Sequence, residues 1–420
     1  MENGWVLIRR QADIQAAPVV HPAPPAFPGN RSTLLSTVGD YKVTMKIAQI
    51  APLIESVPPR LYGGTERIVS YLTEALVGLG HDVTLFASGD SITSAELTPC
   101  CTRALRLDPT AGDTIPHLIL MIDKVWERAR EFDILHFHID LFQFPLFRSL
   151  AARTLTTLHG RQDLGDLKPF YSRFGEMPLV SISNDQRKPI PNANFVATIH
   201  HGIPPDLHRP SFEQGSYLAF LGRISPEKRP DRAIRIARAA GVPLKIAAKV
   251  DKVDEDYFRN DILPLIDGPD VEFIGEINER EKTKFLGEAA ALLFPVDWPE
   301  PFGLVMIEAM ACGTPVLAFR CGSIPEVIED GVTGKVVNSE EEAIAALPEI
   351  LSYDRRAVRQ RFEERFTATR MAKDYVSTYR QLRATRTLTK PPRQLALNGG
   401  NGLAAVSIEK PIPVLIGTGE

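Results

Sequence analysis

Short apolar runs alternate with amphipathic stretches through most of this chain, and that alternation constrains the fold more than any other feature. In the first half, the apolar runs fall at 46–50, 83–88, 133–138, 153–158, 178–182 and 195–200. Apolar residues at helical spacing lie between several of them, as at 64–79 and 115–130. Strands that alternate with helices in this way indicate βαβ units and therefore parallel sheets.

A second series of the same kind begins after a proline-rich linker. Pro204, Pro205 and Pro210 precede Gly215, and a new apolar run starts at residue 217. Further strands are predicted at 244–248, 271–274, 291–296 and 315–319, with helices at 230–240, 255–266, 278–290 and 303–311. The sequence thus predicts an α/β fold with two doubly wound, Rossmann-like domains, at 45–208 and 215–366, that face a central cleft.

The two ends of the chain lack this alternation. Five prolines lie between Pro18 and Pro28, and we expect residues 1–44 to be a disordered extension. The strand pattern starts abruptly at Met45, so one hypothesis is that Met45 is the physiological start. Residues 387–420 are rich in proline and glycine and are predicted to be a disordered tail.

Composition excludes several classes of protein. The 48 Lys and Arg residues against 52 Asp and Glu leave a net charge of −4, which argues against a dedicated nucleic-acid binder. No apolar stretch approaches the roughly 18 residues of a membrane span or the pattern of a signal peptide, so we expect a cytoplasmic protein. The four cysteines show no metal-binding spacing, and reduced thiols are expected.

Candidate functional residues in the first half follow predicted strands. Gly63 and Gly64 open a helix, where backbone amides can approach a phosphate or a sugar, although a plain turn explains them equally well. His138 ends a strand and is favoured as a hydrogen-bond partner of a sugar, whereas His136 fits a core position. His159 follows the next strand. These histidines lack the spacing of a metal site.

Two cations follow the first strand of the second half. Arg223 and Lys228 lie in a loop after the apolar run at 217–222. Fixed cations at that place can neutralise a diphosphate and stabilise its charge as it leaves. A solvated basic loop is the alternative interpretation.

The stretch from Trp298 to Pro315 carries the strongest signal. Pro301 suits the first position of a helix, which makes Glu300 a cap residue, and the free amides of Phe302, Gly303 and Leu304 would bind an anion. Glu308 lies among apolar residues of the same helix, so its carboxylate needs partners such as two vicinal hydroxyls. An exposed surface position is the alternative. Ser323 stands in a later glycine turn, a second candidate nest of amides for phosphate.

Together these residues resemble the family 4 glycosyltransferases, retaining enzymes of the GT-B fold that use nucleotide-sugar donors. The resemblance covers about residues 45–385, and its most specific part is the E-x7-E spacing of Glu300 and Glu308. Supporting matches are Gly63-Gly64, His138, Gly222-Arg223 with Lys228, and the segment 323–327. The chain departs from the family at Cys321-Gly322-Ser323, where many members have paired glycines, and at His200-His201-Gly202, where many have Asn before Gly.

The resemblance implies a role for each matched position. Glu300 would contact hydroxyls of the donor sugar, Glu308 the ribose, Arg223 and Lys228 the diphosphate, and His138 the sugar near its reacting carbon. Gly63, Gly64 and the amides of 302–304 would face the phosphates or the sugar. A last helix at 367–386 would cross back onto the first domain.

The resemblance also implies an activity, which is transfer of a hexosyl unit from a nucleotide sugar to an acceptor hydroxyl with retention of configuration. We expect a UDP-sugar on the frequency of donors in the family, a saccharide or lipid-linked saccharide as acceptor, and no nucleic-acid partner. No cofactor is expected, and no metal ion is required, because the two cations supply the positive charge that a metal would. Alternatives are a nucleotide-sugar epimerase of similar fold, a phosphorylase with pyridoxal phosphate, and a non-catalytic nucleotide-sugar-binding protein.

Two aromatic-rich stretches, 141–148 and 168–174, have two interpretations. Either they belong to the core of the first domain, or they face a lipid-linked acceptor or the membrane at its cytoplasmic side. The core is the simpler interpretation.

Overall fold

The computed structural model describes residues 44–60 and 63–388 of the chain. The predicted extension at 1–44 and the predicted tail at 387–420 lie outside the described residues, apart from Thr44 and the last two positions of the final helix. The hypotheses about the start at Met45 and about these two ends therefore stay predictions.

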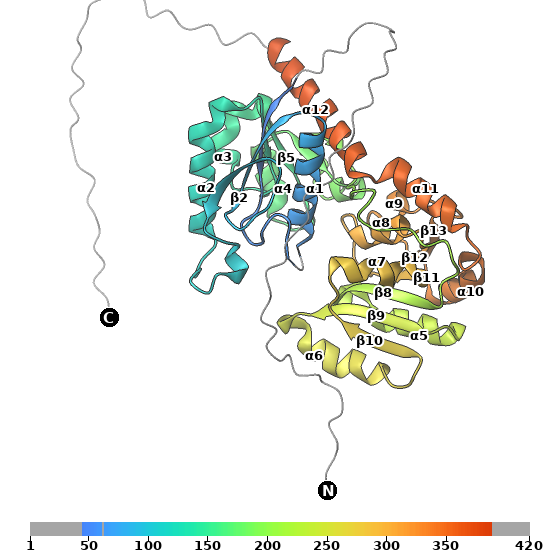
Figure 1. Ribbon diagram of the computed structural model, residues 1–420. Helices are drawn as coiled ribbons and strands as arrows, with labels where there is room; N and C mark the ends of the chain where they lie inside the picture. Colours follow the sequence, from blue (N-terminus) through green and yellow to red (C-terminus); the bar gives the residue numbers. More distant parts are fainter. Residues whose placement is uncertain (1–43, 61–62, 389–420) are drawn as a thin grey trace, which may run out of the picture. The chain divides into compact units, whose positions relative to one another are not determined.

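The first sheet has seven parallel strands in the order β3-β2-β1-β4-β5-β6-β7. The strands are β1 (Lys46–Ile50), β2 (Asp82–Ser88), β3 (Glu96–Cys101), β4 (Ile134–Phe137), β5 (Thr154–Thr157), β6 (Leu179–Ser181) and β7 (Phe195–Thr198). The helices α1 (Gly64–Gly78), α2 (Ile115–Arg128), α3 (Phe144–Phe147) and α4 (Leu167–Arg173) connect them (Figure 1). The central strands β4 and β5 are buried along their whole length, as parallel strands covered on both faces should be.

The second sheet has six parallel strands in the order β10-β9-β8-β11-β12-β13. The strands are β8 (Tyr217–Ile224), β9 (Leu244–Val250), β10 (Val271–Gly275), β11 (Ala289–Phe294), β12 (Val316–Phe319) and β13 (Gly334–Val337). Its helices are α5 (Pro230–Ala240), α6 (Glu255–Tyr257), α7 (Glu279–Gly287), α8 (Leu304–Ala311), α9 (Ile324–Val327), α10 (Glu340–Ile350) and α11 (Arg355–Arg365). The two parallel α/β sheets confirm the predicted fold class.

Some elements differ from the prediction. The helix expected at 255–266 is broken, because α6 passes into a π-helical turn at 258–262 and a 3-10 turn at 263–265. The strand β3 was not predicted, since it is a half-exposed edge strand that contains Pro99. Neither were α10 and α11. Proline is tolerated in β3 because an edge strand does not need every backbone donor.

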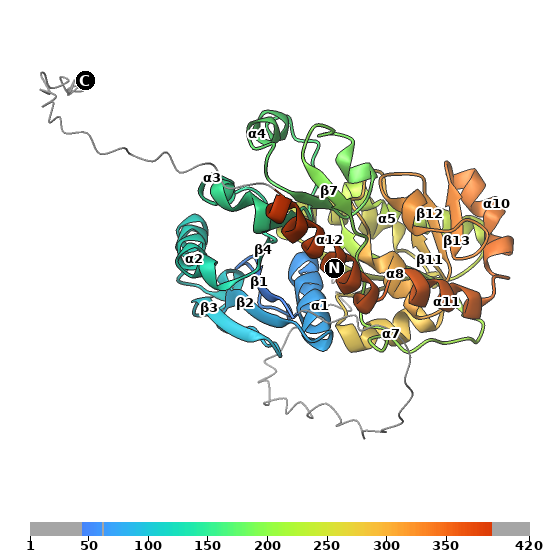
Figure 2. The same cartoon turned by 90° about the horizontal axis from the view of Figure 1, so that it is seen from above.

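The last helix, α12 (Ala368–Leu388), joins the two halves of the fold. It starts beside the second sheet, where Ile203 pairs with Thr367, and then packs along α1 on the first sheet (Figures 1 and 2). Tyr375 and Tyr379 of this helix are buried against the first sheet. The chain thus crosses between the sheets twice, once in the linker before β8 and once in α12.

A carboxylate also bridges the two halves near the cleft. Glu326 of α9 accepts hydrogen bonds from the backbone amides of Asn184 (2.7 Å) and Asp185 (2.8 Å), which follow β6. Burial alone would raise the pKa of this carboxyl. The bonds from His200 and from the two amides outweigh burial and lower the pKa of Glu326 to about 2.

The aromatic stretches contribute mainly to the core. Phe144 and Phe147 are fully buried, and Phe170 and Phe174 pack against Phe144 with ring centroids 5.3 and 5.7 Å apart. Phe142 is exposed. Among the described residues, no helix is both long and apolar enough to cross a membrane. Contact with a membrane surface stays a prediction.

Candidate active site

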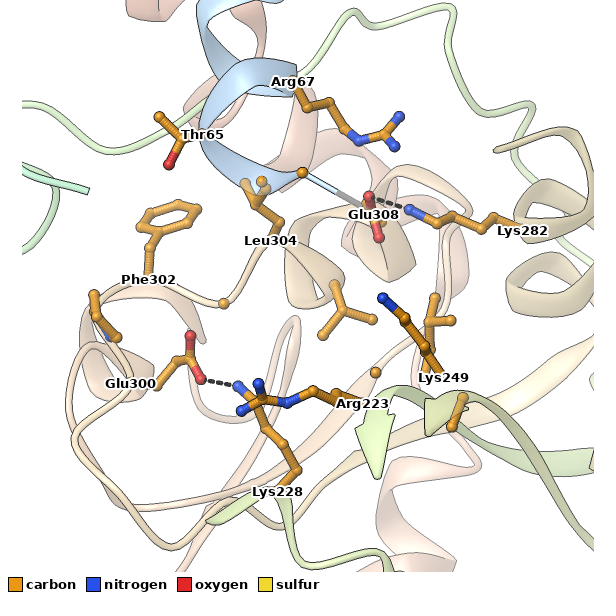
Figure 3. A pocket seen from close by; sticks show the side chains of 18 of the residues that line it. Thr65, Arg67, Arg223, Lys228, Lys249, Lys282, Glu300, Phe302, Leu304 and Glu308 are labelled. Carbon is orange, nitrogen blue, oxygen red and sulfur yellow. Dashed lines mark hydrogen bonds and ion pairs between the residues drawn. The ribbon is translucent and has the colours of Figure 1, made fainter. Parts of the chain in front are cut away.

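A cavity of about 530 Å³ lies between the carboxyl ends of the two sheets. It is lined from the first half by the start of α1 and the turn after β5, and from the second half by the ends of β8 and β9 and the segment 298–308. Figure 3 shows side chains from both halves reaching into it. The predicted site residues that line it are Gly63, Gly64, His159, Arg223, Lys228, Glu300, Phe302, Gly303, Leu304 and Glu308. His138 and Ser323 lie behind the lining.

Glu300 is held in place by two donors on the cavity wall. Lys228 Nζ donates to Oε2 of Glu300, and Trp298 Nε1 donates to the same oxygen at 3.0 Å (Figure 3). The Lys228 ammonium also lies over the Trp298 ring, 5.1 Å from its centroid. The side chain of Glu300 is 12% exposed and lines the cavity, so its carboxylate is both fixed in orientation and open to the cavity.

The turn after β12 supports the Glu300 loop from behind. Gly322 has a φ of 57°, and a Cβ there would meet the backbone nitrogen and oxygen of Glu300 at 2.4 Å, so only glycine fits. Ser323 donates its backbone amide to the Glu300 carbonyl (2.9 Å) and its hydroxyl to the Phe302 carbonyl (2.9 Å). Ser323 is fully buried. It therefore positions the loop and does not line the cavity, unlike the predicted amide nest for phosphate.

The helix that carries Glu308 begins later than predicted. Pro301 was expected at its first position, but α8 starts at Leu304, and Gly303 precedes it with a φ of 82°. A Cβ at Gly303 would lie 2.8 Å from the Met306 side chain. Because the first amides of a helix have no partner within it, the wall formed by Phe302 to Leu304 still offers donors and the positive end of a helix dipole.

Arg223, at the end of β8, is surrounded by carboxylates. It donates to Glu227 and lies 3.7 Å from Asp251 and 3.8 Å from Asp254. The three acidic groups stand on the loops that follow β8 and β9. They hold a charged guanidinium at the cavity edge, where it can exchange a carboxylate for a phosphate of similar geometry.

Glu308 is 4% exposed and lies in a network of charges. Its Oε1 accepts from Lys282 Nζ at 2.9 Å (Figure 3). Burial would raise the pKa of this carboxyl, but Lys282, His208 and Arg67 outweigh it and lower the pKa. Glu308 is therefore an anion whose other oxygen can accept from a hydroxyl.

The same corner holds three groups with the chemistry of metal ligands. His208, Glu279 and Glu308 offer ligand atoms within 4.8 Å of one another. However, Lys282 and Arg67 contact the same carboxylates. A divalent ion would stand beside two positive charges, so the group suits an ion-pair network better than a cation site.

His138 and His159 do not share the position that the sequence suggested. His159, after β5, lines the cavity. His138 is only 2% exposed. Its Nδ1 lies 2.9 Å from His159 Nε2, so the two rings share a hydrogen bond. The strand β4 ends at Phe137, directly before His138, and the His138 ring is buried. Direct contact of His138 with a sugar therefore stays a prediction. His159, which lines the cavity, is better placed for such a contact.

Several lining residues were not predicted. Lys249 lies one residue before the end of β9, Lys282 lies in α7, and Thr65, Glu66 and Arg67 stand in the first turn of α1. Burial raises the pKa of Glu66. The position of Lys249 at the carboxyl end of a parallel strand was a usable signal, and Thr65 and Glu66 directly follow the glycines of the predicted motif.

Two family profiles match the chain and together span most of this fold. The profile "Glycosyltransferase Family 4" matches residues 62–239, and the profile "Glycosyl transferases group 1" matches residues 208–367. The two profiles cover both halves of the cleft. The chain belongs to glycosyltransferase family 4. The motifs that suggested this family, from Gly63 to Val327, all lie within the matched region.

Curated relatives of this family 4 member match over part of their length. The D-inositol 3-phosphate glycosyltransferase of Mycolicibacterium smegmatis is 32% identical over 180 residues, which is 39% of this chain and 39% of that protein. An uncharacterized protein of Klebsiella pneumoniae is 33% identical over 124 residues, 30% of this chain and 33% of its own length. The chain thus spans about a third to two fifths of the curated relatives it matches.

Solved structures share the fold of this family 4 member. Sucrose-phosphate synthase from Thermosynechococcus elongatus superposes with a TM-score of 0.63 at 20% identity, over 81% of this chain and 100% of that chain. HepE from Anabaena, solved with UDP and glucose, gives a TM-score of 0.61 at 17% identity, over 80% and 100% of the two chains. Both superpose on four fifths of this chain, including its two parallel sheets, which agrees with the predicted GT-B fold.

Proposed function

We propose that this protein transfers a hexosyl unit from a UDP-sugar to the hydroxyl of a saccharide or lipid-linked saccharide, with retention of configuration at the transferred carbon. The observation that carries the proposal is the composition of the cleft. One cavity brings the fixed carboxylates of Glu300 and Glu308 together with the cations Arg223 and Lys228. Family membership makes glycosyl transfer the expected class of reaction.

The charges in the cavity suit a nucleotide sugar. Arg223 at the end of β8 and Lys228 in the turn after it can neutralise a diphosphate, and the amides at the start of α8 line the same cavity. Glu308, held as an anion by Lys282, can accept from the vicinal hydroxyls of a ribose. Glu300 can accept from hydroxyls of the sugar while Lys228 and Trp298 hold its other oxygen.

The proposed reaction takes place on one face of the sugar. The bond from the anomeric carbon to the diphosphate oxygen breaks, and the acceptor oxygen bonds to that carbon from the same side. The acceptor proton passes to the departing diphosphate. Arg223 and Lys228 stabilise the negative charge that grows on the leaving group, which is where fixed charge accelerates a reaction.

We propose that this reaction needs no divalent ion. Arg223 and Lys228, which pair with Glu227 and Glu300 in the structure, would supply the two positive charges that face a bound diphosphate. Among the described residues, the set of potential metal ligands is His208, Glu279 and Glu308, and the charges of its carboxylates are compensated by Lys282 and Arg67. An ion at that corner would have to displace the charges that hold Glu308 for the ribose.

A screen of donor sugars tests the proposal. Purified protein is incubated in EDTA with UDP-, GDP- and ADP-sugars, with and without saccharide acceptors, and release of the nucleoside diphosphate is followed. We expect release from one donor class, and NMR of the glycoside should show the anomeric configuration of the donor. Conversion of the nucleotide sugar to an epimer without an acceptor would establish the alternative reaction, and an inverted product would contradict the proposed mechanism.

A further inference from the structure

A continuous run of buried hydrogen bonds connects the last helix to the cavity. Tyr379 of α12 accepts a hydrogen bond from Gln49 Nε2 at 3.2 Å. Gln49 Oε1 lies 2.8 Å from His138 Nε2, and His138 Nδ1 lies 2.9 Å from His159 Nε2. Tyr379, Gln49 and His138 are at most 2% exposed, and His159 lines the cavity. The four residues come from α12, β1 and the ends of β4 and β5.

The amide of Gln49 determines where the protons of this run lie. Its oxygen can only accept, so His138 must carry a proton on Nε2 and donate it to Gln49 Oε1. A neutral imidazole has one N–H, so His138 Nδ1 is then an acceptor. His159 Nε2 must therefore carry the proton and donate it to His138. The remaining ring nitrogen of His159, Nδ1, has a free lone pair.

Both rings are neutral, which this assignment requires. Burial lowers the pKa of His138 well below its ordinary value, with His136 adding to the effect. Burial also lowers the pKa of His159, to about 3. At neutral pH neither ring carries a second proton, so Nδ1 of each ring remains a hydrogen-bond acceptor.

The far end of the run suits this orientation of the Gln49 amide. Gln49 Nε2 faces both Tyr379 Oη and His136 Nδ1, the latter at 3.3 Å. The Tyr379 hydroxyl lies 2.7 Å from His136 Nδ1 and donates its proton there, so its oxygen is left to accept from Gln49. His136 Nε2–H can then donate to Thr157 Oγ1 at 2.7 Å. In this arrangement each bond of the run from Tyr379 to His159 pairs one donor with one acceptor.

We propose that Gln49, oriented by Tyr379, is a positioning residue that fixes the tautomer of His159, so that His159 presents an unprotonated Nδ1 to a hydroxyl of the sugar bound in the cleft. Among the described residues, the His159 ring forms one hydrogen bond, which is the bond from its Nε2 to His138. The other nitrogen is therefore available on the cavity side. A sugar group beside His159 Nδ1 must donate a hydrogen bond. The site therefore accepts a hydroxyl there and rejects an ether or fluorine substituent, which cannot donate. The inference rests on the proposed function of the cleft.

The tautomers are measured directly by nitrogen NMR of protein labelled at histidine. In the wild-type protein we expect the proton of His159 on Nε2 and a bare Nδ1. Tyr379→Phe removes the hydroxyl that orients Gln49, and Gln49→Met removes the amide, so both should give mixed tautomers of His138 and His159. Tyr375→Phe is the matched control. Tyr375 lies in the same helix as Tyr379, but its hydroxyl bonds Thr157 of β5 (2.9 Å) and not Gln49.

Donor kinetics give the second readout. In Tyr379→Phe and Gln49→Met, KM for the donor should rise about threefold to tenfold, the effect of one neutral hydrogen bond, while kcat stays close to wild type. Tyr375→Phe should leave KM unchanged. A wild-type His159 protonated on Nδ1, or tautomers that do not change in either variant, would overturn the inference.

The two readouts separate this inference from the proposed function. If the wild-type protein binds no nucleotide sugar but shows the expected tautomer, the proposed function fails and the proton assignment stands. If it binds the donor with the opposite tautomer, only the inference fails. The wild-type spectrum decides the assignment even if a variant does not fold.

Discussion

Lys228 Nζ and Glu300 Oε2 form a direct ion pair on the wall of the cleft, with Trp298 Nε1 bonded to the same carboxylate oxygen. The pair joins the residue proposed to hold the diphosphate to the residue proposed to hold the sugar. In the proposed complex, Lys228 would bind the diphosphate while it also holds the carboxylate of Glu300 that orients the sugar. The predictions below start from this pair.

Replacement of Lys228 tests the stabilisation of the leaving group. Lys228→Ala should lower kcat roughly a hundredfold or more, because the charge that develops in the transition state loses a fixed cation. The rate of release of the nucleoside diphosphate at saturating donor is the measurement. Lys252→Ala, an exposed lysine outside the cavity lining, is the matched control. A Lys228→Ala turnover within about threefold of wild type would make the assignment wrong.

Replacement of Glu308 tests the contact with the ribose. Glu308→Gln keeps the size of the side chain but loses the charge, so KM for the donor should rise about tenfold to a hundredfold, as for hydrogen bonds to charged groups. kcat should change much less, since the ribose does not react. Initial rates across donor concentrations measure both constants. A fall in kcat with KM unchanged would place Glu308 at the reacting carbon instead.

The buried histidines predict how stability depends on pH. Burial lowers the pKa of His136, His138, His159 and His201. The unfolded chain, with an ordinary pKa of about 6.5, therefore binds more protons than the folded chain below that pH. The free energy of unfolding should fall as the pH drops below about 6.5, by up to about 1.4 kcal/mol per pH unit for each histidine. Asp140, whose pKa burial raises to about 6, opposes this trend, and so do the carboxyls of Glu55, Glu66 and Asp254, whose pKa values burial also raises.

Urea unfolding at a series of pH values from 5 to 7.5 measures this slope. His201→Phe keeps a ring against Phe302, 4.9 Å away in the wild type, and removes one titrating group. We expect a shallower dependence on pH in the variant. Equal slopes in the two proteins would show that the cluster does not titrate as the structure requires.

The arginines of α11 are predicted to support the second sheet. Arg355 donates to the carbonyls of Ser211 (2.9 Å), Gly287 (2.8 Å) and Ala289 (2.7 Å), and to Thr314 Oγ1 (2.7 Å). Arg355→Met leaves these buried acceptors without a donor and should lower the free energy of unfolding by about 3 kcal/mol or more. Chemical denaturation measures the loss. Arg280→Met, at an exposed position of α7, should change it little.

The same helix shows why part of the fold could not be predicted from the sequence. In α11 the buried face includes Arg355 and Arg359, which are inside because they bond to backbone carbonyls. A charged residue at a core position breaks the apolar periodicity by which a helix is recognised. The strand β3 was missed for a related reason, since its edge position tolerates Pro99 and polar residues.

The site was more predictable than these elements because its residues follow strands. Gly63 and His159 follow β1 and β5 of the first sheet, while Arg223 and Glu300 lie at the end of β8 and after β11 of the second. Because the carboxyl edges of two such sheets face one cleft, these residues could be grouped without a structure. The sequence does not tell which side of a loop a residue takes. His138 and Ser323 turn away from the cavity, and Lys249 and Lys282 enter it, because of contacts between distant segments.

Titration of nucleoside diphosphates into the protein in EDTA tests the central claim most directly. Isothermal titration calorimetry with UDP, GDP and ADP should show one site for one of them without a metal ion. Arg223→Met should abolish or greatly weaken that binding, because the diphosphate loses a fixed charge, and Arg280→Met should not. Binding that requires a divalent ion, or that is the same in Arg223→Met, would contradict the account of this cleft as a metal-independent nucleotide-sugar site.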